Sequence, residues 1–121
     1  MKVNTKAKIH IGTSLRDTVA DAKRDIARFE AGETVDEQHI AFENWQALFN
    51  VLTPKRYELL QHLYRTREPS IRALSRALGR DFKRVHEDVH ALAEAGLLEY
   101  DEDGLDVSYG AIETRIPLGS E

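Results

Sequence analysis

The chain has 121 residues, of which 41% are hydrophobic and 31% are charged, and its formal net charge is −4. This size and composition are those of one globular domain, and the absence of cysteine excludes disulfide frameworks and thiolate zinc sites. Because no apolar run reaches about 18 residues and the first residues lead into no signal-peptide core, we expect a cytoplasmic protein with no membrane contact.

Charge is unevenly distributed along the chain. Residues 53–90 hold nine Lys and Arg against five Asp and Glu, whereas the remainder is strongly acidic. One basic face on an acidic body is typical of a protein that meets phosphate groups with a single surface. The alternative is ordinary variation in a highly charged protein.

Residues 1–52 are predicted to form a strand–helix extension. Strict alternation over residues 3–11 indicates a half-buried strand, and Gly12 ends it. Apolar residues spaced by four and three then predict a helix over 13–31 with a narrow apolar seam, which fits packing on its own domain or on a second subunit. The residues that we assign to dimerisation are Ile9, Ile11, Leu15, Val19, Ala22, Ile26 and Phe29. A short strand over 39–42 and a short helix over 45–52 follow.

The boundaries of three further helices are marked by capping residues. Thr53 is a good N-cap with Pro54 behind it, Ser70 and Asp81 are N-caps of the next two helices, and Gly79 provides the left-handed residue that closes the middle one. The predicted elements are helices over 54–66, 71–78 and 82–95, a hairpin over 97–108 and a strand over 112–118 that is at a sheet edge because Pro117 lacks a donor.

Helical periodicity predicts which side chains of these helices turn inward. In the middle helix, Arg72, Ser75 and Arg76 are expected to point outward. The predicted inward residues are Tyr57, Leu59, Leu60, Leu63 and Tyr64, then Ile71, Leu74, Ala77 and Leu78, then Phe82, Val85, Val89 and Leu92.

The order helix, helix, tight turn, helix, hairpin predicts an α+β fold, a winged helix-turn-helix with a three-helix core and a β-hairpin wing over residues 53–118. In such a fold the N-terminal half of the third helix enters the major groove of DNA. The residues that we expect to bind duplex DNA are Ser70, Arg72, Arg76, Arg80, Lys83, Arg84, Glu87 and His90. Arg80, Lys83 and Arg84 are expected to contact bases and phosphates and Glu87 a cytosine amino group, while the other cations meet phosphate. A scaffold of the same shape that binds only protein is the alternative.

Residues 74–92 and Gly96-Leu97-Leu98 resemble the core of MarR-like winged-helix regulators. The chain is most similar to a group of small prokaryotic predicted transcriptional regulators, in which a Phe-Glu-x-Trp/Pro segment and a Leu-Thr-Pro-Lys-Arg helix start precede this core. Here these are residues 42–45 and 52–56, so the likeness covers about 80 residues. The resemblance implies operator binding as a homodimer, and some such regulators act as antitoxins beside a small toxin. The departure is the wing tip, where Asp101, Glu102 and Asp103 would repel phosphate.

The third helix also carries a His-Glu-x-x-His pattern, at His86, Glu87 and His90. In zinc proteases this pattern supplies two zinc ligands and a general base. The other histidines lie far away in sequence, so no third ligand is evident, and His86 borders the apolar row, which favours a partly buried structural role. We therefore predict no metal site, with regulatory metal binding as the alternative.

No phosphate-binding loop, Ser-His-Asp set or paired carboxylate arrangement occurs in the sequence. We therefore expect a transcriptional regulator, a dimeric repressor, and neither an enzyme nor a cofactor-binding protein. The second hypothesis is an antitoxin or protein-binding module whose N-terminal region engages a cognate toxin or another protein, with DNA binding secondary or absent.

Overall fold

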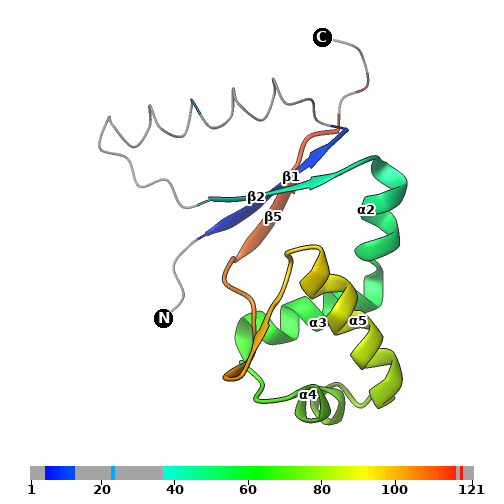
Figure 1. Ribbon diagram of the computed structural model, residues 1–121, viewed down its shortest axis with the longest axis vertical. Helices are drawn as coiled ribbons and strands as arrows, with labels where there is room; N and C mark the ends of the chain where they lie inside the picture. The colour runs from blue at the N-terminus through cyan, green and yellow to red at the C-terminus, as the bar shows by residue number, and fades with distance from the viewer. Residues whose placement is uncertain (1–4, 13–22, 24–36, 117, 119–121) are drawn as a thin grey trace.

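The computed structural model describes residues 5–12, 23, 37–116 and 118. The described chain is a mixed α and β structure in which a small sheet lies beside three packed helices and a hairpin (Figure 1). Its elements are β1 (Lys6–Ile11), β2 (Glu37–Phe42), α2 (Trp45–Val51), α3 (Pro54–Arg65), α4 (Ile71–Leu78), α5 (Phe82–Glu94), β3 (Glu99–Asp101), β4 (Gly104–Asp106) and β5 (Ala111–Thr114). The expected α+β class is confirmed, and α3, α4 and α5 agree with their predicted boundaries to within one residue. Among the described residues no helix is long and apolar enough to cross a bilayer.

The capping residues set these helix boundaries as predicted. The side-chain oxygens of Thr53, Ser70 and Asp81 accept hydrogen bonds from the amides three residues later, at 3.3, 3.0 and 3.3 Å respectively. Gly79 closes α4 with a φ of 66°, which only glycine adopts at little cost. The connection between α4 and α5 is therefore three residues long and closely defined.

A three-stranded parallel sheet has the order β2-β1-β5. The strand predicted over 112–118 is an edge strand, as expected, but it ends at Thr114 and its partner is β1. Lys8 thus lies between His39 of β2 and Glu113 of β5. The sheet therefore combines two strands from residues 1–52 with one strand from residues 53–118.

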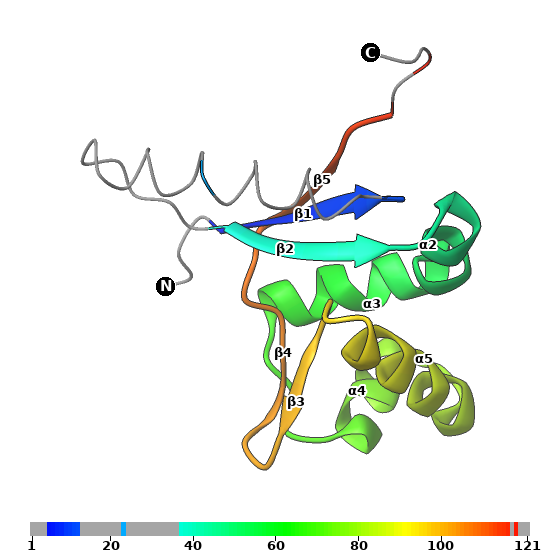
Figure 2. The ribbon, with the colours of Figure 1, turned by 45° about the horizontal axis from the view of Figure 1, so that its top comes forward.

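The core extends from the inner face of this sheet past α3 to α4, α5 and the hairpin, and α4 and α5 lie on the far side of α3 from the sheet (Figure 2). Alternation along β1 turns Ala7 and Ile9 toward the helices, with exposed fractions of 0% and 4%. The largest fully buried side chains are Leu59, Leu63, Leu74, Leu92, Leu97, Leu105, Val85, Val89 and Val107. One hydrophobic core therefore joins the sheet, the helices and the hairpin.

The hairpin of β3 and β4 is fastened to the connection between α3 and α4. The amide of Leu105 donates to the carbonyl of Glu68 at 2.8 Å, and the amide of Glu68 donates to the carbonyl of Leu105 at 3.3 Å. In the connection between β4 and β5, the Tyr109 hydroxyl donates to the Leu97 carbonyl at 2.7 Å, and burial raises the pKa of Tyr109. The hairpin thus has a fixed position beside the helices.

Several side chains of α3, α4 and α5 that were predicted to turn inward are exposed in the structure. In α3 the buried row is Leu59, Leu60 and Leu63, whereas Tyr57 and Tyr64 are exposed, because the leucines alone fill the space under the sheet. The Tyr57 hydroxyl accepts from Nε2 of Gln61 at 3.1 Å, so its polar end has a partner at the surface.

The prediction for α4 and the start of α5 was also wrong at three positions. Ala77 is exposed and Ser75 is buried. The burial of Ser75 costs little, because its hydroxyl donates to the Arg72 carbonyl and needs no other partner. Phe82 is exposed at the first turn of α5, where it packs under Arg72.

Candidate nucleic-acid interface

Most of the residues predicted to bind DNA are exposed on α4 and α5. Six of them are exposed, namely Arg72, Arg76, Lys83, Arg84, Glu87 and His90. Within the described part of the chain, no carboxylate forms an ion pair with Arg76, Lys83 or Arg84. This surface therefore offers cations that are available to an external anion.

Arg72 links the two helices. Its guanidinium carbon lies 4.6 Å from the centroid of the Phe82 ring, within the range of a cation–π contact. The contact places the cation beside the first turn of α5. The exposure of Phe82, which periodicity alone did not predict, thus serves to position a cation.

Ser70 is half-buried, and its side-chain oxygen accepts from the Ala73 amide at 3.0 Å. The hydroxyl hydrogen is not used in this cap, because a hydroxyl both accepts and donates. Ser70 stands at the N-terminus of α4, where backbone amides favour an anion.

Arg80 lies apart from the other predicted contacts. Its Nη2 donates to Oδ2 of Asp88 at 2.8 Å, and its side chain is only 19% exposed. The second oxygen of Asp88 accepts from Nε of Arg56 at 2.9 Å. Arg80 is therefore part of a buried Arg–Asp–Arg cluster that joins the turn, α3 and α5, and its charge is used inside the protein.

This cluster was not predicted from the sequence, because Arg56 lies 32 residues before Asp88. The available signal was its position in the chain, directly before the buried Val89 and three residues after the buried Val85. A carboxylate next to such a row is buried only with partners.

His86 and His90 lie on the outer surface of α5 and contact each other. Their Nε2 atoms are 3.2 Å apart and their ring centroids 4.3 Å apart. His90 also meets Tyr100 of the hairpin edge-on, with centroids 6.0 Å apart. The prediction that His86 is partly buried was wrong, because the apolar row turns away from it and its ring is exposed beside Phe82.

Two of the other histidines contact each other although they lie 29 residues apart in the sequence. Nε2 of His10 lies 2.8 Å from Nδ1 of His39, because parallel pairing of β1 and β2 brings the two residues to one face of the sheet. In the part of the chain that is described, no group of three or more ligating side chains could hold a metal ion.

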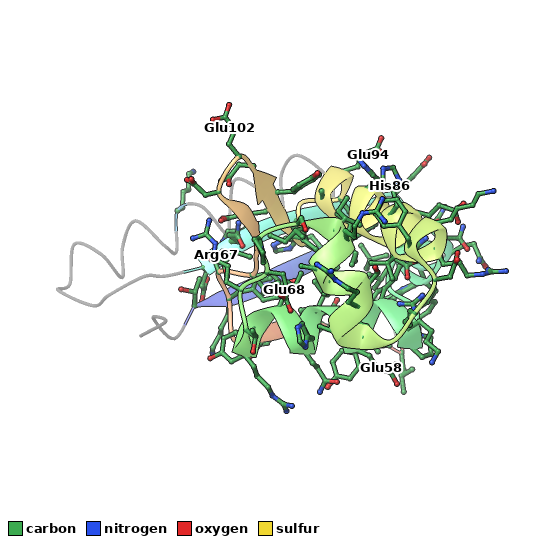
Figure 3. The ribbon with its side chains drawn as sticks, turned by 90° about the horizontal axis from the view of Figure 1, so that it is seen from below. Glu58, Arg67, Glu68, His86, Glu94 and Glu102 are labelled. Atoms are coloured by element: carbon green, nitrogen blue, oxygen red, sulfur yellow. The ribbon has the colours of Figure 1, made fainter. Side chains whose placement is uncertain are left out.

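The tip of the hairpin is acidic and exposed, as the sequence implied. Glu102 stands at its outer end (Figure 3), between the exposed residues Asp101 and Asp103. Arg67 approaches Asp101 at 3.9 Å, a distance that gives only a weak surface pair. The tip therefore presents negative charge beside the cationic helices.

The residues assigned to dimerisation are described only in part. Ile9 is buried and Ile11 half-buried, both in the core of their own chain. The remaining five, Leu15, Val19, Ala22, Ile26 and Phe29, lie outside the described residues. The dimerisation surface on the predicted helix over 13–31 thus stays a prediction.

Comparison with known proteins identifies one family. Neither a curated protein nor a solved structure matches the chain. The model of the HVO_A0114 family matches residues 51–114, a range that begins at the end of α2 and includes α3, α4, α5, the hairpin and β5. The chain belongs to the HVO_A0114 family.

Proposed function

We propose that this protein is a transcriptional regulator that binds duplex DNA sequence-specifically through a winged helix-turn-helix. In this assignment α4 and α5 form the helix-turn-helix, and the hairpin of β3 and β4 is the wing. The antiparallel bridge between Glu68 and Leu105 adds a third, one-residue strand to the wing. The three-residue turn with Gly79 in the left-handed conformation supports the assignment, because it braces α5 against α4.

The observation that carries the proposal is the group of exposed cations on α4 and α5. Lys83 and Arg84 occupy the first turn of α5, the part of a recognition helix that meets base edges. In a chain with a net charge of −4, a surface with four exposed cations beside the exposed acids Asp81 and Glu87 is a suitable partner for phosphate.

Each residue has an expected role on DNA. Lys83 and Arg84 contact bases and adjacent phosphates, and Arg72 and Arg76 contact phosphate. Glu87 lies one turn further along α5 and accepts from a cytosine amino group. Arg80 acts through Asp88 and orients α5, so its contribution is positional.

A dimer would present two copies of α5 to a pseudo-palindromic operator with half-sites about 34 Å apart, and such a regulator would repress by occupying that operator. The resemblance to MarR-like regulators supports the same arrangement.

The test is a selection of bound sequences from random duplexes with the full chain, followed by binding measurements on Lys83→Ala/Arg84→Ala. We expect sequence-specific operator binding to be lost. For the residual, non-specific binding, the slope of log affinity against log salt concentration should fall by about 2, because two cations that contact phosphate are removed. Lys55→Ala/Arg65→Ala removes the same charge from exposed positions of α3 and should retain binding. A folded Lys83→Ala/Arg84→Ala variant that binds like the parent would show that this surface is not the interface.

A further inference from the structure

The geometry of His86 and His90 has a consequence that is independent of DNA binding. Both residues are exposed on one face of α5, because a spacing of four residues corresponds to about one helical turn. Their two Nε2 nitrogens lie 3.2 Å apart. The same nitrogen of each ring is therefore close enough for both to bind one ion.

This separation fits a shared metal ion. Imidazole nitrogens bind zinc at about 2.0–2.1 Å, and two such bonds at a tetrahedral angle place the nitrogens about 3.3 Å apart. Between neutral rings, the contact is a hydrogen bond that needs one donor and one acceptor. A metal ion bound to both nitrogens would replace that hydrogen bond and lie off the line that joins them, with the separation of the nitrogens nearly unchanged.

Neighbouring rings hold the pair from both sides. The Phe82 centroid lies 5.8 Å from that of His86, and the Tyr100 centroid lies 6.0 Å from that of His90. Because the backbone between the two histidines is a regular turn of α5 and the rings have packing partners, little conformational entropy remains to be lost on chelation.

We propose that His86 and His90 form a two-histidine surface site for a divalent transition-metal ion of the imidazole-preferring class, with Zn²⁺ as its simplest member. Water completes the coordination, since the protein supplies two ligands. The site lies between α5 and the wing, and nothing in its geometry requires that the protein bind DNA.

The test is calorimetric titration of the full chain with Zn²⁺, at a pH above the usual pKa of histidine of about 6.5 so that the rings are neutral. We expect one ion per chain. His86→Gln and His90→Gln should each weaken binding on the order of a hundredfold, because the second ligand no longer acts at high effective concentration.

Two control variants make the test specific. His39→Gln breaks the other histidine pair, with His10, and should leave the zinc affinity of the α5 site unchanged. His90→Gln/Glu94→His keeps two histidines on α5 but separates them by about 12 Å along the helix, so it should bind as weakly as His90→Gln. Circular dichroism checks that each variant is folded.

Three outcomes would overturn the proposal. They are parent protein that binds no zinc, folded His86→Gln and His90→Gln variants that bind like the parent, and loss of binding in His39→Gln alone. The experiment contains no DNA, so its result does not depend on whether the protein is a DNA-binding regulator.

Discussion

Arg80 and Asp88 connect the turn between α4 and α5 to the body of α5, with Nη2 of the arginine 2.8 Å from Oδ2 of the aspartate. The arginine lies in the turn before α5, and the aspartate lies near the middle of α5. Arg56 binds the other carboxylate oxygen and also donates to the carbonyls of Asn50 and Val51 at 3.0 Å. One largely buried carboxylate thus joins the end of α2, the start of α3, the turn and α5.

We predict that Asp88→Asn lowers the free energy of unfolding by about 3 kcal/mol, because it leaves two largely buried arginines without their counter-ion. Urea denaturation of parent and variant measures the difference. Glu87→Gln is the matched control, since it neutralises the adjacent exposed carboxylate and should change stability by less than about 0.5 kcal/mol. Equal midpoints for Asp88→Asn and the parent would mean that the cluster contributes no net stability.

The helix boundaries could be predicted from the sequence because they depend on residues that are close together in the chain. Thr53, Ser70, Gly79 and Asp81 mark helix ends through hydrogen bonds and dihedral angles that involve residues at most five positions away. The cations of α4 and α5 were identified for the same reason, since helical spacing alone places them on the outer side.

Long-range relationships could not be predicted in this way. The pairing of β5 with β1 joins residues more than 100 positions apart, and the contact of His10 with His39 depends on strand register. The burial of Asp88 depends on Arg56, 32 residues earlier in the chain. The spacing of α5 places Asp88 beside the buried Val85 and Val89, but it does not identify the partners of the carboxylate.

Two glycines provide a matched pair of substitutions at the hairpin and the turn. A Cβ at Gly104 would lie 2.4 Å from the Glu68 carbonyl oxygen, whereas a Cβ at Gly79 would meet nothing within 4 Å, and both residues have positive φ. We predict that Gly79→Ala costs about 1 kcal/mol from backbone strain alone. Gly104→Ala should cost about 3 kcal/mol, because the hairpin must also move away from residue 68.

Thermal or urea unfolding of the two variants measures this difference. Equal costs would indicate that the hairpin is not held closely against the α3–α4 connection.

Burial of Tyr109 predicts a loss of stability in alkali. Because burial raises the pKa of the folded tyrosine, the unfolded chain loses the phenol proton first, so the stability that the neutral hydroxyl contributes is fully present below about pH 10 and falls above it. Tyr109→Phe removes the hydrogen bond to Leu97 and should cost about 1–2 kcal/mol at neutral pH. The difference between parent and variant should then narrow as the pH rises above about 10.

Urea denaturation at several pH values measures this narrowing. Tyr57→Phe removes an exposed hydroxyl and serves as the control. A narrowing of the same size in that variant would contradict the assignment to Tyr109.

The acidic hairpin tip predicts how the proposed DNA complex responds to charge. Glu102 stands at the outer end of the hairpin, and Glu58 lies on the opposite side of the molecule (Figure 3). If α5 enters the major groove, the tip lies close to phosphates, so Glu102→Lys replaces a repulsion by an attraction. We expect its duplex affinity to rise roughly two- to fivefold at low salt, the range of an exposed charge pair, and the gain to disappear near 1 M salt, where the Debye length is about 3 Å.

Glu58→Lys makes the same change of charge and serves as the control, which should bind duplex DNA with nearly the parent affinity. Equal gains in both variants would show that the effect comes from net charge and that the hairpin lies away from the duplex.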